Sequence, residues 1–157
     1  MSYKTLLIMR HAEKSGDPDD PHLTAEGHAR AQHLASYLPA TFGKPDFLFA
    51  SSISRRSQRP IETLQPLSAN IGVNIDDSYA DQDYGALAHD LRKHASYDGA
   101  LVVVCWHHGN IPNMMHALKA ADGDYPDPWD RKVFNLILRL DMREQETPAI
   151  SRITEPF

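Results

Sequence analysis

Residues 4–9 of the chain read Lys-Thr-Leu-Leu-Ile-Met, and Arg10 and His11 follow directly. The run from Leu6 to Met9 is wholly apolar, but it is too short for a helix, which needs about ten residues or more. A short continuous apolar run is typical of a β-strand that is covered on both faces. We therefore predict a buried strand over residues 4–9, with Arg10 and His11 at its carboxyl end.

Two more apolar runs predict strands of the same kind. Residues 46–50 read DFLFA, and residues 100–105 read ALVVVC after a turn at Gly99. The second run is rich in valine, whose β-branched side chain favours strands. The pattern of apolar residues further predicts a short strand at 73–75, an edge strand at 134–140, and helices at 25–38, 60–70, 84–96 and 112–121. Thr24 can cap the first of these helices, and Pro39 is expected to end it.

Strands that alternate with helices of this length predict right-handed crossovers between parallel strands. We therefore expect an α/β fold, a three-layer sandwich in which a mainly parallel sheet has helices on both faces. The 157 residues and the 41% hydrophobic content suit one core, so we expect a single domain over residues 1–157. In such sheets, ligands bind beyond the carboxyl ends of the strands.

The charge and composition of the chain argue against several classes of partner. The formal net charge is -5, and the sequence has no basic stripe of the kind that binds nucleic acid or anionic membranes. No apolar run approaches the roughly 18 residues that span a bilayer. The single cysteine, Cys105, excludes an internal disulfide, and the first residues lack the pattern of a signal peptide. We expect a cytoplasmic protein that binds neither nucleic acid nor membranes.

Titratable residues follow three of the predicted strands. Arg10 and His11 follow the first strand, His107 and His108 follow the strand at 100–105, and residues 51–59 carry three arginines after the strand at 46–50. Because the carboxyl ends of parallel strands meet at one edge of a sheet, these groups are expected to converge on one crevice. Histidine and arginine together suit a phosphoryl group, since fixed donors must stabilise the negative charge on its oxygens.

Four segments of the chain resemble, in order, the motifs of the histidine phosphatase superfamily, which includes phosphoglycerate mutases and small phosphohistidine phosphatases. The segments are 10–13 (RHAE) for R-H-G/A-E, 23–32 for L-T-x-x-G-x-x-Q-A with the last pair inverted, 59–63 (RPIET) for R-A-x-Q-T, and 103–110 (VVCWHHGN) for V-V-x-H-G. Each motif alone is weak, but four in the same order cover most of the chain. The resemblance implies a phosphatase that acts without a metal ion or other cofactor.

The resemblance also assigns roles to individual residues. It implies that His11 attacks phosphorus and becomes transiently phosphorylated, while Arg10, Arg59 and His108 hold the phosphoryl oxygens. Asn110 is expected to help bind the phosphate through its main chain. Attack requires a neutral His11 whose other ring nitrogen is fixed by a hydrogen bond, for which a backbone carbonyl is a suitable acceptor.

Neighbouring residues compete for two of these roles. Arg59 is preferred to Arg56 because residues 59–63 reproduce the helical part of the motif, although a register built on the preceding serines favours Arg56. His108 is preferred to His107 because the glycine after it would let a backbone amide approach the phosphate closely.

The family also supplies a proton donor for the leaving oxygen, often from the glutamate of an E-x-x-F/Y-G segment. Residues 81–85 (DQDYG) fit that segment with aspartate in its place. Asp81 occupies the matching position and is the preferred donor. Asp83 stays open as the alternative, since it would face the same side of an extended segment.

The sequence gives less support to functions other than a phosphatase. A metal-dependent hydrolase lacks support, because the sequence contains neither H-E-x-x-H nor paired C-x-x-C. A catalytically idle phosphate-binding scaffold of the same fold is the other alternative. A mutase is disfavoured because this chain is too short for the insertions that such enzymes carry. The expected substrate is a phosphorylated small molecule or a phosphoprotein, and the sequence predicts neither its identity nor the oligomeric state.

Overall fold

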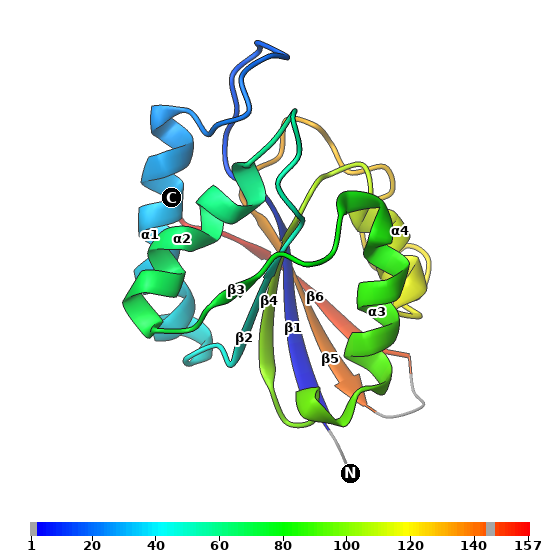
Figure 1. The fold of residues 1–157 in the computed structure, drawn as a ribbon. Coiled ribbons are helices and arrows are strands. Elements are labelled where there is room, and N and C mark those ends of the chain that lie inside the picture. The colour runs from blue at the N-terminus through cyan, green and yellow to red at the C-terminus, as the bar shows by residue number, and fades with distance from the viewer. Residues whose placement is uncertain (1–2, 144–146) are drawn as a thin grey trace.

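A six-stranded sheet with helices on both faces forms the part of the chain that the computed structural model describes, residues 3–143 and 147–157 (Figure 1). The strands are β1 (Tyr3–Arg10), β2 (Phe47–Ala50), β3 (Ile75–Asp76), β4 (Leu101–Trp106), β5 (Leu136–Arg143) and β6 (Ala149–Thr154). They lie in the order β3-β2-β4-β1-β5-β6. The first four are parallel, whereas β5 and β6 run antiparallel to their neighbours. The predicted mainly parallel α/β sandwich is confirmed.

Alternate residues of the central strands form two separate cores. Leu6 and Ile8 of β1 belong to one core, while Leu7 and Met9 belong to the other, and all four are fully buried. This is the reason for the continuous apolar run, since a strand covered on both faces needs apolar residues at every position. The helices on the Leu7 face are α1 (Ala25–Phe42) and α2 (Arg59–Ile71), and those on the Leu6 face are α3 (Tyr84–Lys93) and α4 (Ile111–Ala117).

Helix α1 continues past Pro39, so the prediction that Pro39 ends the helix is wrong. A proline inside a helix leaves the carbonyl four residues earlier without its usual N–H donor. Here that carbonyl belongs to Ala35, and the side-chain amide of Asn70 from α2 donates to it at 2.8 Å. The neighbouring helix thus replaces the hydrogen bond that the proline removes.

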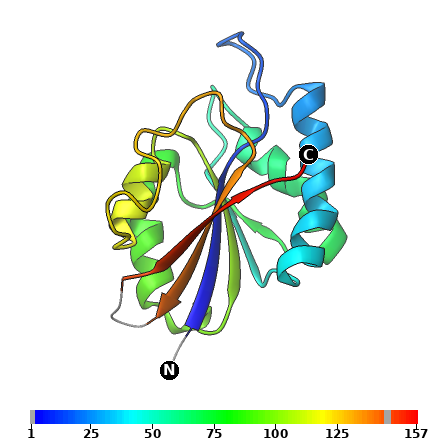
Figure 2. The same ribbon diagram turned by 180° about the vertical axis from the view of Figure 1, so that it is seen from behind.

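The antiparallel side of the sheet also differs from expectation. The strand predicted at 134–140 spans Leu136–Arg143 as β5, and it lies between β1 and β6 rather than at an edge. The edge strand is β6, which the sequence did not predict (Figure 2). None of the residues of β6 is fully buried, so its sequence carries little of the apolar pattern that marks a strand.

The parallel strands bring their carboxyl ends to one edge of the sheet. Arg10 of β1 is paired with Trp106 of β4, and Ala50 of β2 is paired with Cys105. The segments that follow these strands therefore start side by side, as the fold predicts. No helix within the described ranges is long and apolar enough to cross a membrane.

Candidate active site

His11 lies just beyond β1 and is only 2% exposed. Its backbone N–H donates to the carbonyl of Trp106 at 3.1 Å, which holds it against the end of β4. Its ring Nδ1 lies 2.7 Å from the carbonyl oxygen of Ala12. Because a carbonyl only accepts, Nδ1 must carry the hydrogen, and Nε2 keeps a free lone pair. The expected backbone acceptor is thus confirmed, and the ring has the tautomer that a nucleophile at Nε2 requires.

The surroundings of His11 also keep its ring neutral. Burial lowers the pKa of His11 to about 2, and the positive charges of Arg10 and Arg59 act in the same direction. The hydrogen bond to Ala12 opposes this shift only in part. An imidazolium would be both desolvated and repelled here, so the neutral form persists at physiological pH.

This low pKa predicts that His11 does not titrate over the ordinary working range. Between pH 8 and pH 4, the ring nitrogen and carbon NMR signals of His11 should stay those of a neutral imidazole with hydrogen on Nδ1. A midpoint near the ordinary histidine value of about 6.5 would contradict the electrostatics described above. A His11→Asn variant, which lacks the signals in question, provides their assignment.

Two arginines flank His11. Arg10 is 4% exposed, and its Nη1 donates to the carbonyl of Arg131 at 2.5 Å, while its guanidinium carbon lies 4.0 Å from the centroid of the Phe134 ring. Arg59 is 7% exposed, and its Nη1 donates to the carbonyl of Asp20 at 2.7 Å. Both guanidinium groups are therefore held by main-chain carbonyls, which fix their orientation without neutralising their charge.

Neither arginine forms an ion pair with any residue that the structure describes. Burial lowers the pKa of Arg10 to about 10, and the neighbouring charge of Arg59 adds to the effect. In the described part of the chain, the Nε atoms of Arg10 and Arg59 are buried without a hydrogen-bond acceptor. Two like charges and two unpaired donors in one place favour a bound anion with several oxygens.

The alternative arginine, Arg56, lies elsewhere. It is exposed in the loop before α2, where Arg55, Arg56, Pro18 and Asp19 line a cavity of about 420 Å³. Arg59, in contrast, is close enough to His11 to affect its pKa. The structure therefore places Arg59, the arginine that the helical motif selects, near His11. Arg56, which the serine register selects, is not part of this site.

Thr63 connects the loop that carries His11 to helix α2. The backbone N–H of Ala12 donates to the Thr63 hydroxyl at 2.9 Å, and this hydroxyl donates to the carbonyl of Arg59 at 2.8 Å. Thr63 is fully buried, so both bonds are shielded from water. The sequence placed Thr63 in a family motif without a role, and the structure supplies one. It sets the position of Arg59 relative to the loop that carries His11.

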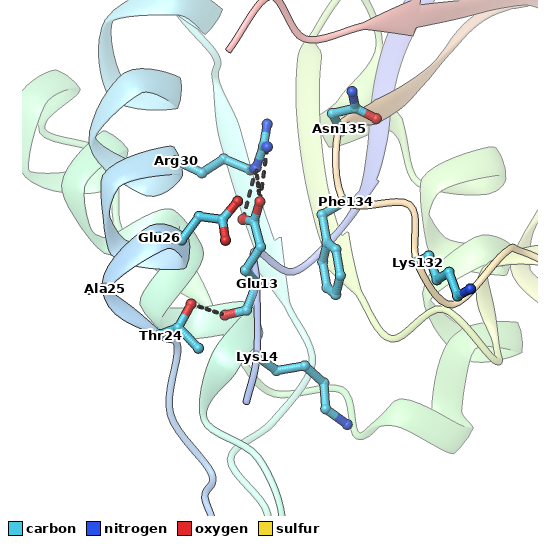
Figure 3. Close-up of a pocket in the computed structure, with 9 residues that line it drawn as sticks. All are labelled: Glu13, Lys14, Thr24, Ala25, Glu26, Arg30, Lys132, Phe134 and Asn135. Atoms are coloured by element: carbon cyan, nitrogen blue, oxygen red, sulfur yellow. Dashed lines mark hydrogen bonds and ion pairs between the residues drawn. The ribbon is translucent and has the colours of Figure 1, made fainter. Parts of the chain in front are cut away.

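A buried ionic cluster holds the loop after β1 from the other side (Figure 3). Arg30 of α1 forms an ion pair with Glu13 at 2.9 Å, and its Nη1 reaches both Glu155 and the carbonyl of Phe157 at 2.9 Å. Gly27 allows α1 to approach this closely, because a Cβ there would overlap the carbonyl oxygen of Glu13. The cluster thus ties the active-site loop, helix α1 and the last residues of the chain together.

The two carboxylates of this cluster differ in acidity because they share one arginine. Burial acts to raise the pKa of Glu13, but the hydrogen bonds and charge of Arg30 lower it overall. Burial raises the pKa of Glu155 to about 7, and the negative charge of Glu13 adds to this shift against Arg30. Glu13 therefore stays ionised, and the loop keeps its ion pair with α1 at neutral pH.

His107, rather than His108, has its ring in contact with the ring of His11. The rings of His11 and His107 meet edge to face, with centroids 5.4 Å apart. His108 instead lines a cavity that Arg10 also lines, described below. The sequence favoured His108 over His107 as the residue that holds a phosphoryl oxygen, and this assignment stays a prediction. The glycine after His108 suggested that choice, but His107 is the residue that directly follows β4 and so sits at the strand end beside His11.

Asp81 is the aspartate that faces this site. It opens a short 3-10 turn, η1 (Asp81–Asp83), and its carbonyl accepts from the Trp106 indole at 3.1 Å and from the Asn110 amide at 3.4 Å. Among the described residues, none donates to its buried Oδ1. Burial lowers the pKa of His107, and the charge of Asp81 opposes this shift, which places Asp81 close to that ring. Asp83 is exposed and caps its own turn.

Asn110 lies at the N-terminus of α4, next to His107 and Asp81. Its backbone N–H donates to the carbonyl of His107 at 3.2 Å, so this donor is engaged within the turn that precedes α4. Its side chain reaches the carbonyl of Asp81 and accepts from Asn113 at 2.9 Å. Asn110 thus hydrogen-bonds to both His107 and Asp81, and its role in binding phosphate through the main chain stays a prediction.

A cavity of about 600 Å³ opens outside Arg10. The residues that line it are Arg10, Lys14, Ser15, Gly16, His108, Arg131, Lys132 and Phe134. A second cavity of about 580 Å³, drawn in Figure 3, contains the Glu13–Arg30 ion pair and shares Lys14, Lys132 and Phe134 with the first. The first cavity is thus bordered by two separate loops, one with Ser15 and Gly16 and the other with Arg131 and Lys132.

The side chains around His11 suit an anion. Within residues 3–143 and 147–157, no group of three or more His, Cys, Asp or Glu side chains is placed to hold a metal ion. Arg10 and Arg59 instead lie near His11 and His107 and lower the pKa of both rings, although burial is the larger effect. A group with several anionic oxygens matches this set of donors.

Comparisons with known proteins point to one family. The model described as "Histidine phosphatase superfamily (branch 1)" matches residues 6–98. No curated protein sequence matches the chain. Among solved structures, the protein histidine phosphatase SixA complexed with tungstate has a TM-score of 0.68 at 16% identity, over 96% of each chain.

Two further solved structures have the same fold. Phosphoglycerate mutase from Plasmodium falciparum has a TM-score of 0.63 at 16% identity, over 98% of this chain and 91% of that one. That enzyme has little sequence outside the shared fold, so the short length of this chain does not speak against a mutase of that kind. A mycobacterial glucosyl-3-phosphoglycerate phosphatase has a TM-score of 0.63 at 13% identity, over 97% and 98%. At these identities the similarity shows a shared fold, and the activity has to be argued from the site.

Proposed function

This chain belongs to the histidine phosphatase superfamily, and from that premise we propose that it is a phosphatase that acts through a phosphohistidine on His11. Its substrate is a phosphomonoester or a phosphohistidine, carried by a small molecule or a protein. The observation that supports this most directly is the hydrogen bond from His11 Nδ1 to Ala12, which leaves Nε2 free to attack. The two buried arginines beside it supply donors for the group under attack.

In the first step, the lone pair of His11 Nε2 forms a bond to phosphorus as the bond to the leaving oxygen breaks. Arg10, Arg59 and the N–H of a neutral His107 donate to the three other oxygens, whose charge they stabilise throughout the transfer. Asp81, in its acid form, gives a proton to the leaving oxygen. The products of this step are an alcohol, or the corresponding leaving group, and a phosphorylated His11.

In the second step, water attacks the phosphorus of the phosphohistidine. Asp81, now a carboxylate, takes a proton from the water as the new P–O bond forms. The P–N bond breaks, and its electron pair returns to Nε2 of His11. Inorganic phosphate leaves, and the Ala12 carbonyl holds the ring in the same tautomer for the next cycle.

The test is turnover of p-nitrophenyl phosphate by the purified chain, with and without excess chelator. We expect hydrolysis at an unchanged rate in the chelator, because this mechanism uses no metal ion. A loss of activity that added divalent metal restores would favour a metal-dependent hydrolase instead. Measurable phosphate binding without turnover of any phosphomonoester would favour an idle scaffold of the same fold.

A further inference from the structure

The cavity outside Arg10 contains more positive charge than one phosphoryl group needs. Arg10, Lys14, Arg131 and Lys132 all line it, and none of its lining residues is acidic. The chain as a whole has 21 acidic and 16 basic residues, so the lining of this cavity is positively charged although the net charge of the chain is negative. Arg10 belongs to the phosphoryl site, which leaves the other three cations beside it without an assigned role.

The two lysines, Lys14 and Lys132, form no ion pair in the part of the chain that the structure describes. The acid next to Lys14 in the chain, Glu13, is already paired with Arg30. Burial lowers the pKa of Lys14, and the charges of Arg59 and Arg10 add to the effect, so its ammonium group lies within electrostatic reach of the phosphoryl site.

Phe134 connects the lysines to the reacting centre. On one side, the Phe134 ring contacts the site around His11. The guanidinium carbon of Arg10 lies 4.0 Å from the Phe134 ring centroid, and the ring centroid of His11 lies 6.2 Å from it. On the other side, Phe134 lines the second cavity together with Lys14 and Lys132. Figure 3 shows both lysine side chains extending away from the Glu13–Arg30 ion pair. They come from different loops but border the same two cavities.

We propose that the substrate is a small phosphomonoester whose leaving group carries a second anionic group, a carboxylate or a phosphate, bound by Lys14 and Lys132. The proposal rests on the proposed phosphatase function and specifies its substrate class. With the phosphoryl group held by Arg10 and Arg59, a leaving group in the cavity extends past Phe134 toward these lysines. A cavity of about 600 Å³ has room for such a leaving group.

The first test compares substrates that differ only in the second charge. One pair is 3-phosphoglycerate and glycerol 3-phosphate, where a carboxylate is replaced by a hydroxymethyl group. The other pair is fructose 1,6-bisphosphate and fructose 6-phosphate, which differ by a phosphate. In at least one pair we expect kcat/KM to be about tenfold or more higher for the more anionic member, as a charge-assisted hydrogen bond supplies. The pair that responds identifies the anionic group as carboxylate or phosphate.

The second test uses lysine variants. Lys14→Gln and Lys132→Gln should each lower that preference by roughly tenfold, mainly through KM, because the lost interaction lies away from the reacting atoms. Lys44→Gln removes the same charge from an exposed site at the opposite end of β2, and it should keep the wild-type preference. Unchanged preferences in both lysine variants would overturn the assignment of these residues.

The outcomes separate the two proposals. Turnover of p-nitrophenyl phosphate with no preference within either substrate pair would overturn the anionic leaving group and leave the phosphatase function standing. No turnover of any of these compounds or of a phosphohistidine peptide would overturn the phosphatase function itself, and the substrate class with it.

Discussion

Replacement of His107 by alanine is expected to lower kcat/KM by about 10²–10³-fold, the usual cost of removing one donor to a transition-state oxygen. His108→Ala should cost less than about tenfold. We expect different losses because the two rings lie in different places. The ring of His107 meets that of His11 edge to face, with centroids 5.4 Å apart, whereas His108 lines the cavity of about 600 Å³ next to Arg10. The two substitutions are chemically identical at adjacent positions, so they form a matched pair.

The measurement is steady-state kinetics on p-nitrophenyl phosphate for both variants, with near-ultraviolet circular dichroism to check the fold. His107→Gln keeps a side-chain N–H donor and should recover part of the loss, which a purely structural role for His107 would not predict. A larger loss for His108→Ala than for His107→Ala would contradict the geometry and restore the glycine-based choice made from the sequence.

Replacement of His11 should have the largest effect of any single substitution. We expect His11→Asn to lower turnover by at least about 10³-fold, because covalent catalysis depends on the nucleophile and no neighbouring group can replace it. Asparagine retains a side-chain amide close to the position of Nδ1, so it can still donate to the Ala12 carbonyl. The loop should therefore keep its structure while losing the free lone pair at Nε2.

Two controls make this result specific. His28→Asn changes an exposed histidine on α1 and should keep wild-type turnover. Inorganic phosphate should still bind to the His11→Asn variant, since Arg10 and Arg59 remain in place. Loss of both turnover and phosphate binding would indicate a collapsed site, and wild-type turnover in the variant would exclude His11 as the nucleophile.

The central strands could be predicted because burial on both faces requires a continuous run of apolar residues. β1 and β4 are covered on both faces, so every inward position is apolar and the run is continuous. The parallel arrangement followed from the helices between them, and it placed the titratable residues at one edge. For this reason the sequence predicted that His11 and Arg10 lie near Arg59.

Other parts of the fold depend on contacts that no local pattern records. Helix α1 passes Pro39 only because Asn70, 35 residues from Ala35 in the chain, donates to the carbonyl that the proline leaves open. β6 is half exposed and pairs with β5 through its backbone, so its side chains do not have to alternate in polarity. Tertiary contacts decide both cases, and propensity alone does not.

The details of the site were harder to predict for a similar reason. The groups that orient Arg10 and Arg59 are the main-chain carbonyls of Arg131 and Asp20, which any residue could supply. The choice between His107 and His108 depends on where β4 ends, and element boundaries are the least certain feature of a sequence-based prediction. The sequence therefore predicted which residue types gather at the site, and the structure gives the positions of the individual side chains.

The most direct test of the mechanism is to trap the phosphorylated enzyme. The protein is mixed briefly with a phosphomonoester and quenched in alkali, in which a phosphohistidine is stable, and the modified residue is located by mass spectrometry of its peptides. Our account predicts phosphate on Nε2 of His11, lost on acid treatment and absent from His11→Asn. Phosphate on any other residue, or rapid turnover with no phosphorylated His11 at any quench time, would contradict it.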